Sequence, residues 1–159
     1  MSQNSALDRT DIAILRLLQN DARLTNKEIA AKVGLAPSSA HERLKRMRAD
    51  GVLRGAHAEV DPAALGIGLE ALLMIGLAKH KRETVDRFIR EVAEISEVRS
   101  VFLVTGRHDL IVHVAVRGMA HLKDLALDRF TSRPEVNRVE TSILFEAAYR
   151  HELPVFRAG

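Results

Sequence analysis

The first fifty residues carry three apolar stripes at helical spacing, each introduced by a helix-start signal. Asp8 and Asp11 stand at the spacing of an N-cap and an N3 acid. Thr25 and Glu28 form a second capping box, and Pro37 suits a first helical turn because its missing N–H is not needed there. We therefore predict helices over residues 8–20, 25–33 and 37–50. Their apolar faces are expected at Ile12, Ile14, Leu15, Leu17 and Leu18, at Ile29, Ala30 and Val33, and at Ala40, Leu44 and Met47.

Strand-like and helical patterns alternate through the second half of the chain. Apolar or alternating runs predict strands over 69–78, 98–104, 110–116 and 136–145, and helical stripes cover 83–95 and 119–131. Residues 105–109 suit a hairpin loop between the second and third of these strands. The order βαββαβ is that of the ferredoxin-like arrangement, so the chain is expected to be an α+β protein.

The segment between the two halves predicts a wing and a hinge. After Gly51, residues 52–60 have the character of one or two short strands, as in a wing that follows a third helix. Gly66 and Gly68 mark a flexible connection to the first strand of the second half.

The predicted third helix has a polar face opposite its apolar stripe. At about 100° per residue, Ser38, Glu42 and Lys45 point directly away from the stripe. Small residues let such a helix approach base edges, while Arg and Lys reach phosphates or guanine, as in a helix-turn-helix. The DNA-facing residues are expected to be Ser38, Ser39, His41, Glu42, Arg43, Lys45, Arg46 and Arg48, with Arg54 from the wing. The alternative is an ordinary helical hairpin with a solvated charged face.

A ferredoxin-like fold places both helices on one face of its sheet and leaves the other face bare. The run 110–116 is nevertheless apolar at both alternating sets of positions. Strands that are buried on both sides have this pattern. We therefore predict an obligate homodimer in which a second copy covers the open face, near Ile111 and His113.

Composition and charge agree with a DNA-binding protein and argue against several other classes. Residues 1–60 hold ten Lys and Arg against seven Asp and Glu, whereas residues 61–159 hold fourteen of each. The positive excess of the 159-residue chain therefore lies in the half with the predicted helix-turn-helix. There is no Cys, and no apolar run reaches membrane-spanning length, so a soluble cytoplasmic location is expected. The seven histidines show no metal-ligand spacing, and no nucleophile with a plausible base is evident.

Five short motifs extend over nearly the whole chain. They are Leu7-Asp8-x-x-Asp11-x-x-Ile14-Leu15, Glu28-Ile29-Ala30-x-x-Val33-Gly34-Leu35, Arg43-Leu44-x-x-Met47, Gly51-Val52-Leu53 and Val104-Thr105-Gly106-x-x-Asp109. In these motifs and in its two-domain order the chain resembles the Lrp/AsnC (feast/famine) family of transcriptional regulators. The expected domains are a winged helix-turn-helix over 1–60, a hinge over 61–68, and an effector-binding and oligomerisation domain over 69–159 with an ACT-like architecture.

The resemblance implies regulation by a free amino acid, dimers built on the second domain, and further assembly to octamers, with no cofactor. It also implies that the hairpin loop lines the effector site between neighbouring dimers, where Asp109 suits an α-ammonium group. The effector-binding residues are expected to be Leu103, Gly106, Arg107, His108, Asp109, Met119, Ser142 and Leu144.

Two positions depart from the family pattern. Ala36 stands where the family usually has Ser or Thr, which removes roughly 1 kcal/mol of N-cap stabilisation from the third helix. Arg107 and His108 stand where the family often has an acidic and an aromatic residue. This basic pair leaves room for an acidic or polar effector; the alternative is that both are exposed turn residues.

Two other functions are compatible with the same architecture. Enzymes resembling sirohaem decarboxylases share the two domains, but the comparable region here has no Trp, and Gly106 with Asp109 fits the regulator pattern. A DNA-compacting protein without an effector is the second alternative. The expected function is therefore a sequence-specific DNA-binding transcriptional regulator whose effector is an amino acid.

Overall fold

A computed structural model describes residues 7–78 and 81–156. The chain forms two compact units: a helical unit made of Met1–Glu59 together with Ala148–Gly159, and a sheet unit made of Val60–Ala147. The outermost residues of the predicted domains, 1–6 and 157–159, lie outside the described part of the chain.

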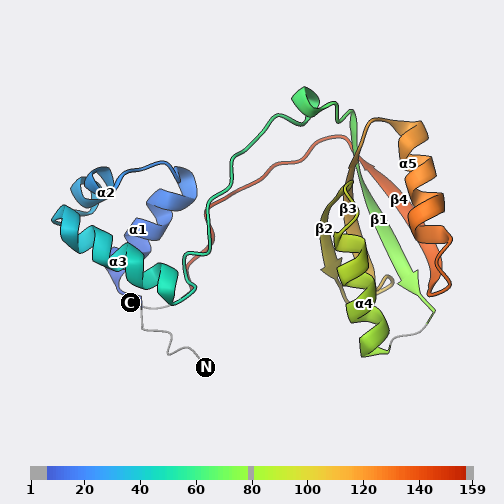
Figure 1. The fold of residues 1–159 in the computed structure, drawn as a ribbon, viewed down its shortest axis with the longest axis horizontal. Coiled ribbons are helices and arrows are strands. Elements are labelled where there is room, and N and C mark those ends of the chain that lie inside the picture. Colours follow the sequence, from blue (N-terminus) through green and yellow to red (C-terminus); the bar gives the residue numbers. More distant parts are fainter. Residues whose placement is uncertain (1–6, 79–80, 157–159) are drawn as a thin grey trace. The chain divides into compact units, whose positions relative to one another are not determined.

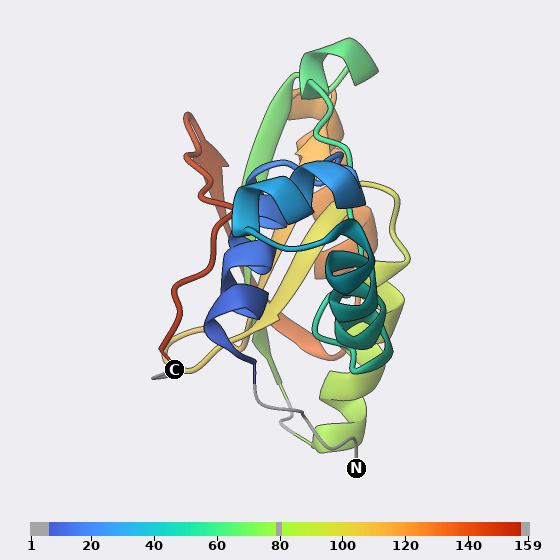
Figure 2. The same cartoon turned by 90° about the vertical axis from the view of Figure 1, so that its left-hand side faces the viewer.

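The helical unit contains three short helices packed as a small bundle (Figure 1 and Figure 2). They are α1 (Arg9–Asn20), α2 (Asn26–Val33) and α3 (Pro37–Ala49). Each predicted boundary is confirmed to within one residue. Complete capping boxes at Asp8 and Thr25 begin the first two helices, and Gly34 ends α2 in the left-handed conformation with φ 69°. Ala36 makes no side-chain cap to α3, as expected.

The bundle buries the predicted stripes of α2 and α3, but the buried face of α1 is shifted. The core consists of Ile14, Ile29, Ala30, Ala40, Leu44 and Met47. On α1 the fully buried residues are Ile14 and Asp11, whereas Ile12, Leu15 and Leu18 are half-buried. The helix is therefore turned so that a carboxylate, and not only its apolar stripe, faces the interior.

The predicted wing is wrong for the described structure, because residues 52–60 form no strand. The amides of Val52 and Leu53 instead donate to the Met47 carbonyl at 2.9 and 3.0 Å, which closes the C-terminal end of α3. Both side chains pack against the helical core. Their β-rich character thus reflects burial against helices, and residues 54–60 continue as an exposed irregular segment.

The sheet unit has the predicted βαββαβ order. Its elements are the 3₁₀ turn η1 (Pro62–Leu65), β1 (Leu69–Leu77), α4 (Arg82–Ala93), β2 (Val98–Leu103), β3 (Leu110–Val116), α5 (Met119–Leu125), the π-helical turn η2 (Ala126–Thr131) and β4 (Val136–Leu144). The strands lie in the order β2-β3-β1-β4, and every neighbouring pair is antiparallel. The predicted α+β ferredoxin-like class is therefore confirmed. One difference is that the helix expected over 119–131 changes to π-helical geometry after Leu125.

Helices α4 and α5 both cover the same face of the sheet (Figure 1). Phe88 and Val92 from α4, and Phe130 from the turn after α5, are fully buried against alternate strand residues such as Leu73 and Val112. The other face of the sheet carries no element of the described chain.

Each of the two hinge glycines is required for a different physical reason. Gly66 closes η1 with φ 76°, a conformation that side chains disfavour. Gly68 lies so close to β3 that a Cβ atom would stand 2.6 Å from the Arg117 carbonyl oxygen. The hinge therefore meets the sheet at a point that only glycine fits.

The C-terminal tail, residues 148–156, belongs to the helical unit and not to the predicted effector domain. The Glu152 carboxylate lies 3.4 Å from Arg16 Nε on α1. The Leu153 amide donates to the Gln19 side chain of the same helix at 2.9 Å. The sequence of the tail has no periodic pattern that would have predicted these contacts.

Candidate DNA-binding surface and ligand site

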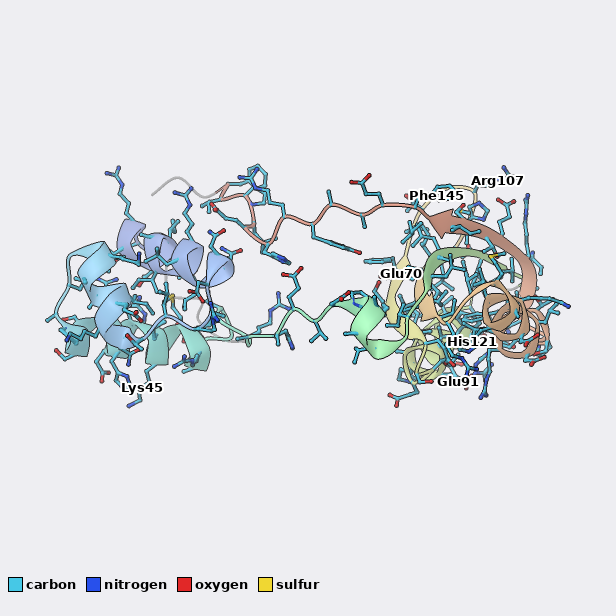
Figure 3. All side chains as sticks on the ribbon, turned by 90° about the horizontal axis from the view of Figure 1, so that it is seen from above. Lys45, Glu70, Glu91, Arg107, His121 and Phe145 are labelled. Atoms are coloured by element: carbon cyan, nitrogen blue, oxygen red, sulfur yellow. The ribbon has the colours of Figure 1, made fainter. Side chains whose placement is uncertain are left out.

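The outer surface of α3 has the predicted composition. Ser38, Ser39, His41, Glu42, Lys45 and Arg48 are all exposed, while Ala40, Leu44 and Met47 on the opposite side are buried. Figure 3 shows Lys45 pointing away from the other two helices. Small hydroxyl side chains thus occupy the N-terminal turn and cations follow, an arrangement that allows close approach to a nucleic-acid groove.

Two of the predicted DNA-facing arginines are paired with a buried carboxylate of α1. Arg43 Nη1 lies 2.8 Å from Asp11 Oδ1, and Arg46 Nη2 lies 2.5 Å from Asp11 Oδ2. The Asp11 side chain is 1% exposed, so this carboxylate is shared by two cations from α3. Arg46 is exposed, as expected of a DNA-facing residue, but its guanidinium is also paired with α1. The sequence showed Asp11 as a capping residue but gave no sign of its burial.

Asp8 adds a second carboxylate to the same cluster. Its Oδ2 lies 2.6 Å from Arg43 Nη1. The Asp11 backbone N–H and the Arg43 guanidinium both lower the pKa of Asp8. Conversely, the hydrogen bond that Arg43 donates to Asp8 and, to a smaller extent, the one that it donates to Asp11 raise the pKa of Arg43. The cluster thus keeps opposite charges in place where α1 and α3 meet.

The remaining predicted DNA contacts differ in their surroundings. Asn26 Nδ2 on α2 lies 3.0 Å from His41 Nδ1, which links the two helices of the helix-turn-helix. None of the ion pairs among the described residues involves Lys45, Arg48 or Arg54. These three cations are exposed and face solvent, so they are the ones available for phosphate groups.

The hairpin loop before β3 is fixed to the neighbouring strands through Asp109. Its carboxylate oxygen Oδ2 accepts the Leu77 amide at 2.7 Å, and its backbone N–H donates to the Ile75 carbonyl at 2.9 Å. Its carbonyl accepts the Val104 amide at 3.0 Å. Gly106 provides the turn with φ 118°. Asp109 therefore has a structural role at the end of β1, whatever else it binds.

Two arginines and a histidine converge on the Glu140 carboxylate of β4. Arg107 Nη2 lies 3.2 Å from Glu140 Oε1, and His108 Nε2 lies 3.4 Å from Glu140 Oε2. Arg138 on the same strand is also paired with Glu140. The expected alternative, in which Arg107 and His108 are simply exposed turn residues, does not hold for His108, whose side chain is only 14% exposed.

The sheet register separates the predicted effector residues into two groups. Leu110 at the start of β3 pairs with Leu103 and Ile75, next to the hairpin loop. Val116 at the other end of β3 leads to Met119. With about 3.4 Å per residue, the two ends of β3 are about 20 Å apart.

Ser142 and Leu144 lie toward the same end of the sheet as Met119. They pair with Leu72 and Glu70, near the beginning of β1. Within one chain, therefore, the loop lies at one end of β3, and Met119 and the end of β4 lie at the other.

A shallow cavity of about 330 Å³ lies at this second end of the sheet. Its walls come from the hinge, the beginning of β1 and the segment after β4, including Asp61, Glu70, Leu144 and Glu146. No sequence pattern had indicated this cavity. Its three carboxylates make it electronegative.

The open face of the sheet is largely apolar. Leu72, Met74 and Ile111 lie on it half-buried, because they alternate with the core residues of β1 and β3. Phe102 on β2 is 51% exposed beside Ile111. One polar pair interrupts this surface, with His113 Nε2 2.5 Å from Glu70 Oε2.

The described residues contain no cluster of three or more side chains suited to a metal ion. Among the same residues, no helix has the length and apolar character needed to span a membrane.

Two family models match the chain, one in each half. Residues 7–54 match the model described as winged helix-turn-helix DNA-binding, and residues 70–154 match the Lrp/AsnC ligand binding domain. A DNA-binding helix joined to a ligand-binding sheet domain defines an effector-modulated, DNA-binding transcriptional regulator. The chain belongs to the Lrp/AsnC family of transcriptional regulators.

Individual relatives cover nearly the whole chain. The HTH-type transcriptional regulator AldR of Mycolicibacterium smegmatis is 36% identical, over 88% of this chain and 82% of the relative. The transcriptional regulator AzlB of Bacillus subtilis is 33% identical, over 91% of this chain and 92% of the relative. The transcriptional regulator NMB0573 of Neisseria meningitidis, solved as a complex with L-Met, has a TM-score of 0.85 at 31% identity, over 91% of this chain and 94% of that one.

Proposed function

We propose that two copies of this regulator join through the open face of the sheet, place α3 in the major groove of duplex DNA, and alter this binding when an amino acid binds near the hairpin loop. The observation that carries the proposal is the two-sided character of α3. Its apolar stripe is buried and its small, polar and basic residues are exposed. This is the arrangement of a recognition helix held rigidly by two others.

The proposed DNA contacts follow from exposure. Ser38, Ser39 and Glu42 lie where base edges would be, and Lys45, Arg48 and Arg54 supply phosphate contacts. Because Arg43 and Arg46 are paired with Asp11, they orient α3 and present only their remaining N–H groups to DNA. His41 supports the helix through Asn26.

The proposed effector site needs more than one copy of the chain. The loop group, Leu103, Gly106, Arg107, His108 and Asp109, forms one part of it. Met119, Ser142 and Leu144 lie at the far end of the same sheet, so they complete the site only if a neighbouring copy supplies them. A dimer that assembles further, as to an octamer, provides such neighbours.

The full-length protein would act on chromosomal DNA in the cytoplasm and would need no metal or prosthetic group. The test is to select bound fragments from a genomic library and then titrate each of the twenty amino acids while measuring affinity for the selected operator. We expect a sequence-specific complex whose affinity changes with at least one amino acid.

Two results would overturn the proposal, each in favour of a rival. Equal affinity for operator and random DNA, with no response to any amino acid, would indicate a DNA-compacting protein. A Soret band shift on mixing with sirohaem, without operator binding, would indicate the decarboxylase-like enzyme.

A further inference from the structure

The carboxylate of Glu140 is outnumbered by cations at the loop end of the open sheet face. Arg107 and Arg138 both pair with it, and His108 lies 3.4 Å from its second oxygen. The four side chains therefore carry a net positive charge even when the imidazole is neutral. One carboxylate cannot fill the donor capacity of two guanidiniums, each of which has five N–H groups.

His108 contributes a second polar group whose hydrogen-bonding capacity is not filled in the same cluster. Its Nδ1 atom is buried and has no hydrogen-bond partner among the described residues. A buried polar atom in this state is costly, and it is often explained by a ligand that completes the site. This nitrogen is not the one that faces Glu140, because Nε2 takes that position, so His108 keeps one unsatisfied ring nitrogen within the cluster.

The loop that carries Arg107 and His108 is anchored to β1 at its end. The Asp109 carboxylate accepts the Leu77 amide, and the Asp109 backbone N–H donates to the Ile75 carbonyl. Arg107 is still 66% exposed and can turn toward a ligand without breaking the loop. The cluster is thus prepared to receive an anion at little conformational cost.

We propose that this cluster selects an amino acid whose side chain ends in a carboxylate, such as L-glutamate or L-aspartate. This inference rests on the proposed function, which places an amino-acid effector at the loop. Guanidinium groups bind carboxylates through paired, charge-assisted hydrogen bonds. An aliphatic side chain in the same place would desolvate the cations and return no hydrogen bond.

The test compares ligands of the same shape and different charge on the full-length protein. Isothermal titration at constant ionic strength measures the Kd of L-glutamate against L-glutamine, and of L-aspartate against L-asparagine. A hydrogen bond to a charged group contributes about 1.5–3 kcal/mol, which corresponds to about a tenfold or greater preference for the acidic member of each pair. L-Leucine and L-methionine serve as aliphatic references.

Three variants locate the preference in the cluster. Arg107→Gln should weaken L-glutamate binding about tenfold and leave L-glutamine nearly unchanged. Arg90→Gln, on an exposed position of α4 on the helix-covered side, is the matched control and should bind as the wild type does. Glu140→Gln removes the competing carboxylate, so it should tighten L-glutamate binding; a purely structural ion-pair cluster would give no such gain.

The results separate this inference from the proposed function. If L-leucine or L-methionine binds and changes operator affinity while L-glutamate and L-aspartate do not bind, the carboxylate preference is overturned and the regulator stands. If L-glutamate binds with the expected variant pattern but operator affinity is constant, the ligand class stands and the proposed regulation is overturned. Equal weakening in Arg107→Gln and Arg90→Gln would show a general ionic effect and overturn the assignment to the cluster.

Discussion

Asp11 shows how a single buried side chain determines the position of a whole surface. Its carboxylate is almost inaccessible and receives guanidinium groups from two successive turns of α3. Removing one partner of a buried ion pair typically costs about 3–5 kcal/mol, because the other charge remains buried without compensation. The orientation of the recognition helix is therefore coupled to α1 by charge as well as by apolar packing.

The cluster makes the helical unit sensitive to acid through Asp8. Since the folded state lowers the pKa of Asp8, its ionised form stabilises folding above the ordinary pKa, and this stabilisation is lost as pH falls through the lowered value. The side chain is half exposed, so we expect an effect of only about 0.5 kcal/mol. Asp8→Asn keeps an N-cap but removes the charge. Urea unfolding should show a less stable variant at pH 6 and nearly equal proteins near pH 2; a gap independent of pH would contradict the assignment.

Lys45 tests the outer face of α3. It is exposed and points away from the bundle, so Lys45→Ala should weaken binding to every DNA sequence to a similar extent. The slope of log Kobs against log salt concentration should flatten by about 0.9, the value for one phosphate contact. Lys123→Ala, exposed on α5 of the sheet unit, is the control. Wild-type salt dependence in Lys45→Ala would mean that α3 meets DNA through another face.

At the scale of elements, the hairpin loop combines a structural anchor with a proposed binding role, and two substitutions separate them. Asp109→Ala leaves the Leu77 amide without its acceptor and should lower the free energy of unfolding by about 1–3 kcal/mol. Asp109→Asn keeps an oxygen acceptor but removes the negative charge, so it should unfold close to the wild type. If Asp109 also binds the α-ammonium group, both variants lose the amino-acid response measured on operator DNA. A normal response in Asp109→Asn would leave only the structural role.

The elements of this fold were predictable because local signals and tertiary packing agree. Capping boxes at Asp8 and Thr25 and the apolar run of β3 specify their elements without help from distant residues. The wing was mispredicted because Val52 and Leu53 have strand-like side chains but pack on helices. A window of sequence cannot distinguish these two ways of burying an aliphatic residue.

The candidate sites were predictable only in part, for a similar reason. Exposure along α3 follows from helical periodicity, so the exposed and buried sides of this helix were predicted correctly. The pairing of Arg46 with Asp11 and the separation of Met119 from the loop depend on helix rotation and strand register. Both are long-range properties that spacing along the chain does not contain.

At the scale of the whole molecule, the open sheet face predicts the state of assembly. Ile111 lies on this face beside the exposed Phe102, so Ile111→Asp would place an unpaired carboxylate in the proposed interface. We expect monomers by sedimentation analysis at concentrations where the wild type is dimeric. Leu127→Asp makes the same chemical change at an exposed position on the helix side and should remain dimeric. Two equally dimeric variants would require a different interface.

The return of the C-terminal tail to the helical unit has a consequence for biosynthesis. A ribosome completes α1, α2 and α3 first, but Glu152 and Leu153, which contact α1, emerge only after the entire sheet unit has been made. The helical unit therefore acquires these contacts only after the sheet unit has been synthesised. A prematurely terminated chain would carry the DNA-binding helices without those contacts and would be the easier target for proteases. The order of synthesis thus favours regulators that possess both the DNA-binding helices and the domain that controls them.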